Sequence, residues 1–328
     1  MREIKNILVT GGAGYVGSAL VPELLRKKFK VTVLDLFIYG DTLDKNPNLT
    51  LVKGDIRNQE LLKKILPNID AVIHLACISN DPSFELDSNL GKSINFDSFE
   101  PMVQLSKELK VYKFIYASSS SVYGIKKERD VNENMSLEPL TDYSIYKAKC
   151  ENILNNYSTN DFIVTTLRPA TVCGYAKRQR LDVVVNILSN LAYHKRKITV
   201  LGGDQLRPNI HIKDMVQSYL DVLEADSKKI NKNIFNVGTE NIKVSDLANL
   251  VRDVIGDDVI IEYKETNDKR SYHISSKKIK DVLGFESKYT IKNAIEDLKK
   301  AFEKKWLHNT LTNEDYFNIA KMQKINLK

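Results

Sequence analysis

The sequence contains few of the residues that build disulfide frameworks and metal sites. Its three cysteines (Cys77, Cys150 and Cys173) stand far apart without CxxC spacing, and its five histidines show no metal-ligand spacing. We therefore predict no disulfide framework and no metal site. Sparse, unpaired cysteines also fit a reducing, cytoplasmic compartment.

Long apolar runs are missing as well. The uninterrupted apolar stretches are only a handful of residues long, whereas a membrane-spanning helix needs about 20. The segment Met1–Ile7 runs directly into a strand-like pattern and contains no apolar signal-peptide core. No membrane interaction is predicted.

The net charge of +7 is local. Residues 269–328 hold 14 Lys/Arg and 7 Asp/Glu, so residues 1–268 are balanced. Aromatic residues do not interleave with these lysines in the way that single-strand binding requires. We interpret the basic end as a solvated helical face and predict no nucleic-acid partner.

Apolar runs and helical patterns alternate through the first half of the 328 residues. Strands are predicted at 6–10, 30–34, 50–53, 70–76, 113–117 and 162–167, with helices at 17–27, 59–66, 95–109 and 143–157. Short apolar strands separated by helices indicate a parallel sheet covered on both faces. The predicted fold is α/β, a Rossmann-type doubly wound sheet.

The pattern changes after Arg168. Helices are predicted at 181–194, 215–225, 245–255 and 291–305, and strands at 198–201, 209–212 and 233–237. We expect a nucleotide-binding domain at 1–174, with 209–238 returning to it. Residues 175–208 and 239–305 would form a smaller C-terminal α/β substrate domain, and 306–328 a tail.

A glycine-rich turn, Gly11–Gly17, follows the first strand and opens the first helix. Gly11 suits a tight turn, Gly14 leaves room for a pyrophosphate, and Gly17 allows close helix packing. Asp35 ends the second strand, where a carboxylate binds the adenosine ribose hydroxyls and repels a 2′-phosphate. Leu36 and Phe37 follow instead of a basic residue, so NAD is favoured over NADP, unless Asp35 merely caps a loop.

Tyr143 and Lys147 lie at i and i+4, on one face of a predicted helix. A nearby ammonium and the positive nicotinamide of NAD+ favour the phenolate and lower the tyrosine pKa. Such a tyrosine can take a proton from a sugar hydroxyl. The serines 118–121 directly follow a strand, where one hydroxyl could bind the reacting oxygen; alternatively they form a polar loop.

Together these features resemble the extended short-chain dehydrogenase/reductase superfamily, in its NAD-dependent nucleotide-sugar epimerase/dehydratase branch. The resemblance covers nearly the whole chain, to about Ala301. The matching pieces are GGAGYVGS (11–18), Asp35, Gly54-Asp55-Ile56, His74-Leu75-Ala76, Asn95, SSSSVYG (118–124), Tyr143 with Lys147, and Arg168-Pro169-Ala170-Thr171.

The resemblance implies roles for individual residues. Tyr143 would be the acid/base, Lys147 would bind the nicotinamide ribose, and Ser119 would be the hydroxyl partner, with Ser120 as the alternative. The implied cofactor-binding residues are Gly11, Gly14, Tyr15, Val16, Gly17, Asp35, Leu36, Asp55, Ile56, Leu75, Ala76, Cys77, Asn95, Ala117, Ser118, Tyr143, Lys147 and Pro169.

The residues after Ser119 narrow the implied reaction. The 4,6-dehydratases of the family carry an Asp-Glu pair there, and this chain has Ser120 and Ser121. The resemblance therefore implies a reaction at a single carbinol carbon and not a dehydration. The chain would be a nucleotide-sugar 4-epimerase, or a 4-ketoreductase or 4-dehydrogenase with net cofactor turnover. A non-catalytic dinucleotide-binding protein is a further alternative, although such relatives usually lose the tyrosine or lysine.

The implied substrate is a nucleotide diphosphate sugar, gripped by Arg207. The other substrate-binding candidates are Ser79, Ser119, Ser120, Thr171, Arg180 and Arg270. Arg178 is also a candidate; the alternative for these arginines is surface charge, and this alternative is stronger for Arg178 than for Arg180. The family dimerises through helices that correspond to 95–109 and 143–157, so a homodimer is expected. The segments 79–84 and 178–186 look like those of relatives from sugar and polysaccharide pathways, and the tail around 313–319 has no assigned role.

Overall fold

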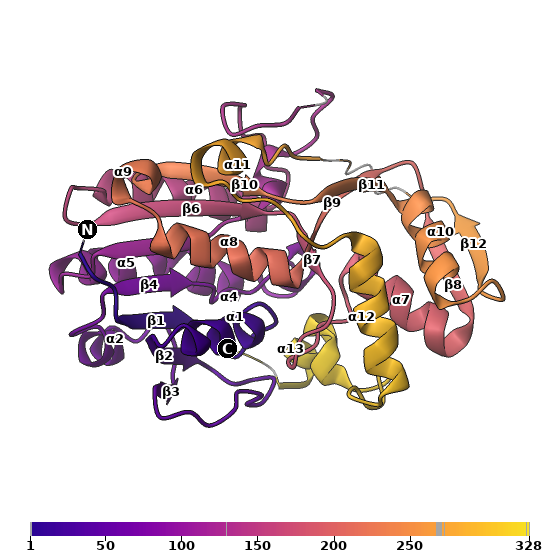
Figure 1. Cartoon of the computed structure of the whole chain (residues 1–328), viewed down its shortest axis with the longest axis horizontal. Coiled ribbons are helices and arrows are strands. Elements are labelled where there is room, and N and C mark those ends of the chain that lie inside the picture. The colour runs from indigo at the N-terminus through magenta and orange to yellow at the C-terminus, as the bar shows by residue number, and fades with distance from the viewer. Residues whose placement is uncertain (1, 129, 267–270, 272, 326, 328) are drawn as a thin grey trace.

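A seven-stranded parallel sheet forms the larger part of the protein (Figure 1). The computed structural model describes residues 2–128, 130–266, 271, 273–325 and 327. The strand order is β10-β6-β5-β4-β1-β2-β3, which confirms the predicted doubly wound fold. The strands are β1 (Asn6–Thr10), β2 (Lys30–Asp35), β3 (Leu49–Lys53), β4 (Ala71–His74), β5 (Lys113–Ala117), β6 (Ile163–Pro169) and β10 (Asn233–Val237).

Each face of this sheet is covered by its own apolar core. Alternate residues of one strand enter different cores: Ile7 and Val9 belong to one, and Leu8 to the other. The first core is closed by α1 (Gly17–Arg26) and α8 (Ile212–Glu224), and α8 crosses in front of the sheet in Figure 1. The second is closed by α2 (Gln59–Ile65), α5 (Phe99–Glu108) and α6 (Asp142–Tyr157).

A smaller α/β part extends from one end of the sheet (Figure 1). It contains a three-stranded sheet, β11-β9-β7, and a parallel pair, β12-β8. Its elements are β7 (Thr171–Cys173), α7 (Val184–Lys195), β8 (Lys197–Leu201), β9 (Leu206–His211), β11 (Glu240–Lys243), α10 (Val244–Ile255), β12 (Ile260–Lys264) and α12 (Ile291–Glu303). The exact domain boundaries stay a prediction.

The predicted strand at 209–212 is placed too late. β9 begins at Leu206, where it pairs with Lys243 of β11, and Ile212 already belongs to α8. His211 ends the strand because its ring nitrogen accepts the Lys213 backbone N–H and caps the helix. The strands β7, β11 and β12 escaped prediction because they are three to five residues long and half-buried.

The helix predicted at 95–109 is broken in two. Residues 93–97 form a π-helical turn, η1 (Ser93–Asp97), and α5 begins only at Phe99. The Asn95 side chain accepts from and donates to the backbone of Ile78, at 2.8 and 2.9 Å. These bonds fix the segment after β4, and the local widening of the helix brings Asn95 into reach of it.

The remaining elements are short. They are α3 (Asp81–Phe84), α4 (Ser88–Lys92), η2 (Ser120–Tyr123), α9 (Ser227–Ile230), α11 (Lys277–Leu283), η3 (Glu314–Tyr316) and α13 (Asn318–Ile325). Among the described helices, none is long and apolar enough to cross a membrane. The described residues also contain no group of three or more His, Cys, Asp or Glu side chains placed to hold a metal ion.

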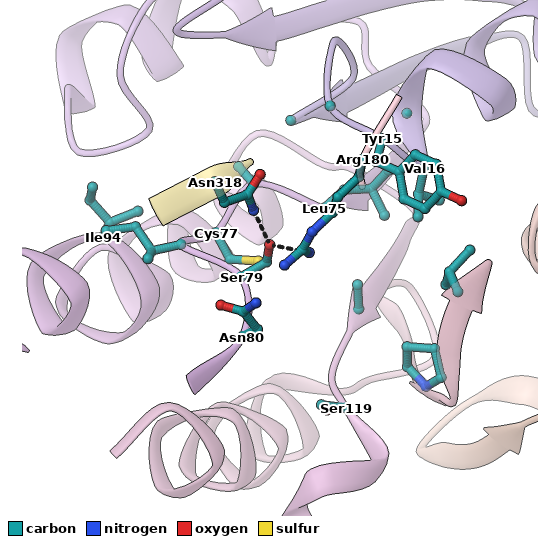
Figure 2. Close-up of a pocket in the computed structure, with 18 of the residues that line it drawn as sticks. Tyr15, Val16, Leu75, Cys77, Ser79, Asn80, Ile94, Ser119, Arg180 and Asn318 are labelled. Atoms are coloured by element: carbon teal, nitrogen blue, oxygen red, sulfur yellow. Dashed lines mark hydrogen bonds between the residues drawn. The ribbon is translucent and has the colours of Figure 1, made fainter. Parts of the chain in front are cut away.

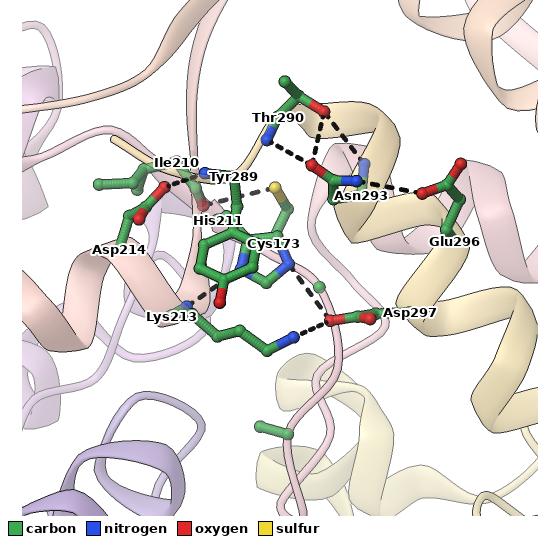
Figure 3. Close-up of polar contacts among 12 residues, drawn as sticks. Cys173, Ile210, His211, Lys213, Asp214, Tyr289, Thr290, Asn293, Glu296 and Asp297 are labelled. Atoms are coloured by element: carbon green, nitrogen blue, oxygen red, sulfur yellow. Dashed lines mark hydrogen bonds and ion pairs between the residues drawn. The ribbon is translucent and has the colours of Figure 1, made fainter. Parts of the chain in front are cut away.

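A polar cluster joins the two parts of the protein (Figure 3). His211 lies at the end of β9, and its Nε2 is 3.4 Å from Oδ2 of Asp297 on α12. Lys213 reaches the same carboxylate at 2.8 Å. Asp214 of α8 accepts the backbone N–H groups of Lys288 and Tyr289, 3.0 and 2.9 Å away. These bonds hold the segment before α12 against the start of α8.

Candidate active site

One large cavity lies at the carboxyl ends of the central strands, where doubly wound sheets bind ligands. It is lined by the turn after β1, by the ends of β2, β4, β5 and β6, and by the first turns of α6. The predicted site residues that line it are Gly11, Gly14, Tyr15, Val16, Gly17, Asp35, Leu36, Asp55, Ile56, Leu75, Ala76, Cys77, Ser79, Ala117, Ser118, Ser119, Ser120, Tyr143, Lys147, Pro169, Thr171 and Arg180.

The glycine turn has the shape of a phosphate cradle. Gly11 has φ +70°, and a Cβ there would lie 2.7 Å from the backbone of Ala76. A Cβ on Gly17 would lie 2.5 Å from the Gly12 carbonyl oxygen. No side chain caps α1, so the positive end of the helix dipole is open to an anion. These features fit the pyrophosphate of a dinucleotide.

Asp35 is placed to bind a ribose. Its Oδ2 accepts the Ala13 N–H at 2.9 Å and its Oδ1 accepts the Phe37 N–H at 2.8 Å. Burial raises the pKa of this carboxyl, and the two backbone hydrogen bonds oppose that effect. Each carboxylate oxygen keeps a further acceptor position, so Asp35 can still receive ribose hydroxyls.

The first turns of α6 carry the predicted catalytic pair. A capping box between Thr141 and Ser144 starts the helix, and Tyr143 and Lys147 then face the cavity. Lys147 is only 4% exposed, and its Nζ donates to the Ala117 carbonyl at 2.7 Å. The same Nζ lies 5.8 Å from the centre of the Tyr143 ring. The ammonium is therefore oriented by β5 and held near the phenol.

Tyr143 and Ser119 meet in the cavity. Burial raises the pKa of Tyr143 above its usual range, and the neighbouring Cys77 and Asp81 add to this. The charge of Arg180 and a hydrogen bond with Ser119 act in the opposite direction. In the protein alone, loss of hydration outweighs Arg180 and Ser119, so the pKa of Tyr143 is raised. The lowered pKa expected from Lys147 together with NAD+ stays a prediction.

A buried ion pair lies beside the predicted catalytic residues and was not anticipated from the sequence. Glu151 stands one turn after Lys147, and its Oε2 lies 2.6 Å from Nη2 of Arg168 on β6. Ser118 donates a hydrogen bond to the same carboxylate. Arg168 also donates to the Tyr123 hydroxyl at 2.7 Å. The only indication in the sequence was the i+4 spacing of Glu151 from Lys147, which places both side chains on one face of the helix.

Arg180 faces the cavity from outside the seven-stranded sheet (Figure 2). Its Nη1 donates to Ser79 Oγ at 2.9 Å, and its Nε donates to Asp182 at 2.5 Å. Its Nη2 is buried without a hydrogen-bond partner in the described residues. One edge of the guanidinium thus remains for a ligand.

The C-terminal helix contributes a part of the site that the sequence did not indicate. Asn318, Met322 and Leu327 line the cavity. Asn318 Nδ2 donates to Ser79 Oγ at 3.2 Å, as Figure 2 shows, and its backbone N–H donates to Asp182 at 2.8 Å. The segment around 313–319 therefore docks on the pocket.

Several predicted residues lie elsewhere. Asn95 does not line the cavity, because its side chain is committed to the Ile78 backbone. Arg207 lies on β9, outside the cavity lining, and donates to the Leu206 carbonyl at 3.0 Å. Arg270 falls outside the described residues. Arg178, a candidate for which surface charge was the alternative, is buried at 4% exposure and lines the cavity.

Comparison with known proteins agrees with this geometry. Residues 7–238 match the NAD dependent epimerase/dehydratase family. A UDP-glucose 4-epimerase of Lactobacillus helveticus is 27% identical over 87% of this chain and 92% of its own length. A human dTDP-D-glucose 4,6-dehydratase is 28% identical over 91% of this chain and 89% of its own length.

Among solved structures, a UDP-glucose 4-epimerase of Thermotoga maritima with UDP-glucose superposes with a TM-score of 0.84 at 25% identity. The match covers 92% of this chain and all of that one. The fold, the glycine turn with Asp35 and the Tyr143–Lys147 pair thus lie within a family match that spans most of the chain. The chain belongs to the NAD-dependent epimerase/dehydratase family and is an NAD-dependent enzyme.

Proposed function

We propose that the protein is a nucleotide-sugar 4-epimerase. The observation that carries the proposal is the meeting of Tyr143, Ser119 and Lys147 in the cavity that also contains the glycine turn and Asp35. Ser120 and Ser121 line the same cavity with hydroxyls, where a dehydratase would need an acid and a base. The similarity to UDP-glucose 4-epimerases supports the same reading.

The residues of the chain would divide the work as follows. NAD, when bound, supplies a reversible hydride acceptor. The Tyr143 oxygen takes the proton of the sugar 4-hydroxyl and later returns it to the opposite stereoisomer. Ser119 donates a hydrogen bond to the reacting oxygen and stabilises the 4-keto sugar. Lys147, anchored to the Ala117 carbonyl, supplies positive charge that favours the Tyr143 phenolate.

The diphosphate of the substrate would bind at Arg180. Arg180 lines the cavity, its Nη2 has no hydrogen-bond partner among the described residues, and Ser79 and Asp182 fix its orientation. A guanidinium held in this way matches phosphate oxygens. Thr171 and Ser120 line the cavity as well and would contact the sugar. We further propose a cytoplasmic homodimer that associates through α5 and α6.

The test is a product analysis with candidate nucleotide sugars. The protein, with bound NAD, is incubated in catalytic amount with UDP-glucose, UDP-N-acetylglucosamine or UDP-glucuronic acid. We expect the 4-epimer by NMR for at least one of them, without net change in the absorbance of reduced nicotinamide. Sustained formation or consumption of reduced nicotinamide would instead establish a 4-dehydrogenase or 4-ketoreductase, and a 4-keto-6-deoxy product would establish a dehydratase.

A further inference from the structure

Arg178 is a buried cation without a matching anion. It is 4% exposed, and no carboxylate of the described residues lies within ion-pair distance of it. Its Nε has no hydrogen-bond partner among the described residues. By contrast, the other two buried arginines of the region, Arg168 and Arg180, are paired with Glu151 and Asp182. Asp35 and Asp182 act on Arg178 electrostatically but form no ion pair with it. A buried guanidinium without direct ion pairing favours an anionic ligand, and Arg178 lines the cavity.

The surroundings of Arg178 place it on the dinucleotide side of the cavity. Its backbone N–H donates to Ser18 Oγ at 3.2 Å, in the first turn of α1. Its guanidinium carbon lies 3.6 Å from the centre of the Tyr39 ring, in the segment that follows β2. It also acts electrostatically on Asp35. Arg178 thus spans from the glycine turn toward the ribose-binding carboxylate.

The guanidinium is held in this position from two sides. Stacking on Tyr39 fixes its plane. Its Nη2 donates to Oδ1 of Asn318 at 2.7 Å, and Asn318 is 5% exposed. Burial lowers the pKa of Arg178 to about 10, so it remains charged at neutral pH. The remaining donors are therefore pre-oriented and charged.

We propose that Arg178 is a cofactor-binding residue that contacts the pyrophosphate of the dinucleotide, and that Asn318 of α13 positions it. The glycine turn would supply neutral amides to the phosphates, and Arg178 would supply the full positive charge. A charge-assisted hydrogen bond of this kind is among the stronger polar contacts. The C-terminal segment would then be part of the cofactor site rather than only a cover over the substrate.

The first test compares Arg178→Gln with Arg180→Gln, two buried arginines in the same cavity. The ligands are NADH, followed by fluorescence, and UDP, followed by calorimetry. We expect Arg178→Gln to weaken NADH binding about tenfold or more and to leave UDP binding within about twofold. Arg180→Gln should show the reverse. Unchanged NADH binding in Arg178→Gln, or a loss confined to UDP, would overturn the proposal.

A second test asks whether the phosphates are the contact. ADP and adenosine compete with NADH for the wild type and for Arg178→Gln. We expect the substitution to weaken ADP and not adenosine. Equal weakening of both ligands would show that Arg178 acts through the shape of the adenosine site, which contradicts a pyrophosphate contact. These measurements need no nucleotide-sugar substrate, so their outcome does not depend on whether the protein is an epimerase.

A third test addresses Asn318. Asn318→Ala should weaken NADH binding by less than Arg178→Gln does. The double variant should bind NADH no more weakly than Arg178→Gln alone, because Asn318 acts through Arg178. Additive losses would remove the positioning role. If Arg178→Gln does not fold, as judged by thermal unfolding, Arg178→Lys keeps the charge but loses the planar fork, and NADH binding should fall only partly.

Discussion

The two walls of the cavity are built in different ways. The sheet wall comprises Gly11–Gly17, Asp35, Ala117–Ser119, Tyr143 and Lys147, which stand at the ends of β1, β2 and β5 or at the start of α6. The outer wall comprises Arg178 and Arg180, which lie in the irregular segment between β7 and α7, and Asn318, the first residue of α13. The regular elements of the sheet wall therefore fix the positions of the predicted catalytic residues. The outer wall supplies two arginines that side-chain hydrogen bonds hold in place.

This difference determines how each wall responds to change. The residues of the sheet wall are fixed by backbone hydrogen bonds of the parallel strands. A single substitution there should remove the role of one side chain and leave the backbone around the cavity unchanged. The outer wall depends on a chain of polar contacts from Ser79 through Arg180 to Asp182 and Asn318. A substitution there should change ligand affinity before it changes the rate of the chemical step.

The largest expected effect is on the sheet wall, at Tyr143. Tyr143→Phe removes the proton acceptor, and general acid–base catalysis is typically worth about 10²–10⁴-fold. We expect kcat for epimerisation to fall by that order while NADH binding stays within about twofold. Steady-state kinetics and NADH titration measure the two quantities separately. Activity that survives the substitution would contradict the acid/base role.

The second prediction concerns the ion pair beneath the sheet wall. The side chains of Arg168 and Glu151 are 3% and 2% exposed. Glu151→Gln leaves Arg168 buried with one fewer charge partner, which typically costs about 3–5 kcal/mol. The free energy of unfolding, measured with urea, should fall by about that amount. The same substitution also weakens the hydrogen bond that Ser118 donates to the carboxylate.

The matched control for this prediction is Glu23→Gln on α1. Glu23 pairs with Arg26 on the surface, and exposed pairs contribute about 0–1 kcal/mol. We expect Glu23→Gln to unfold almost as the wild type does. Equal effects of the two substitutions would mean that the Arg168–Glu151 pair does not stabilise the catalytic segment.

The smallest expected effect lies where the two parts of the protein join. Partial burial raises the pKa of Asp297, but hydrogen bonds from His211 and Lys213 outweigh it and lower the pKa to about 2 (Figure 3). The unfolded value is about 3.9. The carboxylate therefore stabilises the fold above about pH 4, and this contribution is lost as the pH falls toward 2.

Asp297→Asn should remove that contribution. The urea midpoint of the wild type should fall more steeply between pH 5 and pH 3 than that of Asp297→Asn. The catalytic constant at neutral pH should change little, since Asp297 does not line the cavity. Parallel pH dependences of the two proteins would show that the cluster at the joint does not depend on this carboxylate.

The sheet wall could be predicted from the sequence because its chemistry follows local patterns. Gly11–Gly17 directly follows a buried strand, Asp35 ends the next, and Tyr143 and Lys147 share one helix face. Parallel strands bring such positions to the same edge of a sheet. The alternation of strands and helices predicts the doubly wound sheet, whereas the order of its seven strands comes from the structure.

The outer wall could not be predicted because it depends on contacts between distant segments. Arg178 and Asn318 are separated by 140 positions, and no periodic pattern precedes either of them. Surface charge was an open alternative for Arg178, whereas the Tyr39 ring and Asn318 bury it. Asn95 shows the opposite behaviour, since a position that the family motif assigns to the cofactor is bound to the Ile78 backbone.

Tyr15 links the sheet wall to the smaller part of the protein. Its backbone belongs to the glycine turn, its hydroxyl donates to the Gly174 carbonyl at 2.6 Å, and Asn186 of α7 donates to that hydroxyl at 3.1 Å. These two hydrogen bonds connect the glycine turn to Gly174 and to α7 in the smaller part of the protein. A displacement of α7 would therefore also move the glycine turn, so a change in the relative position of the two parts should change the affinity for the dinucleotide.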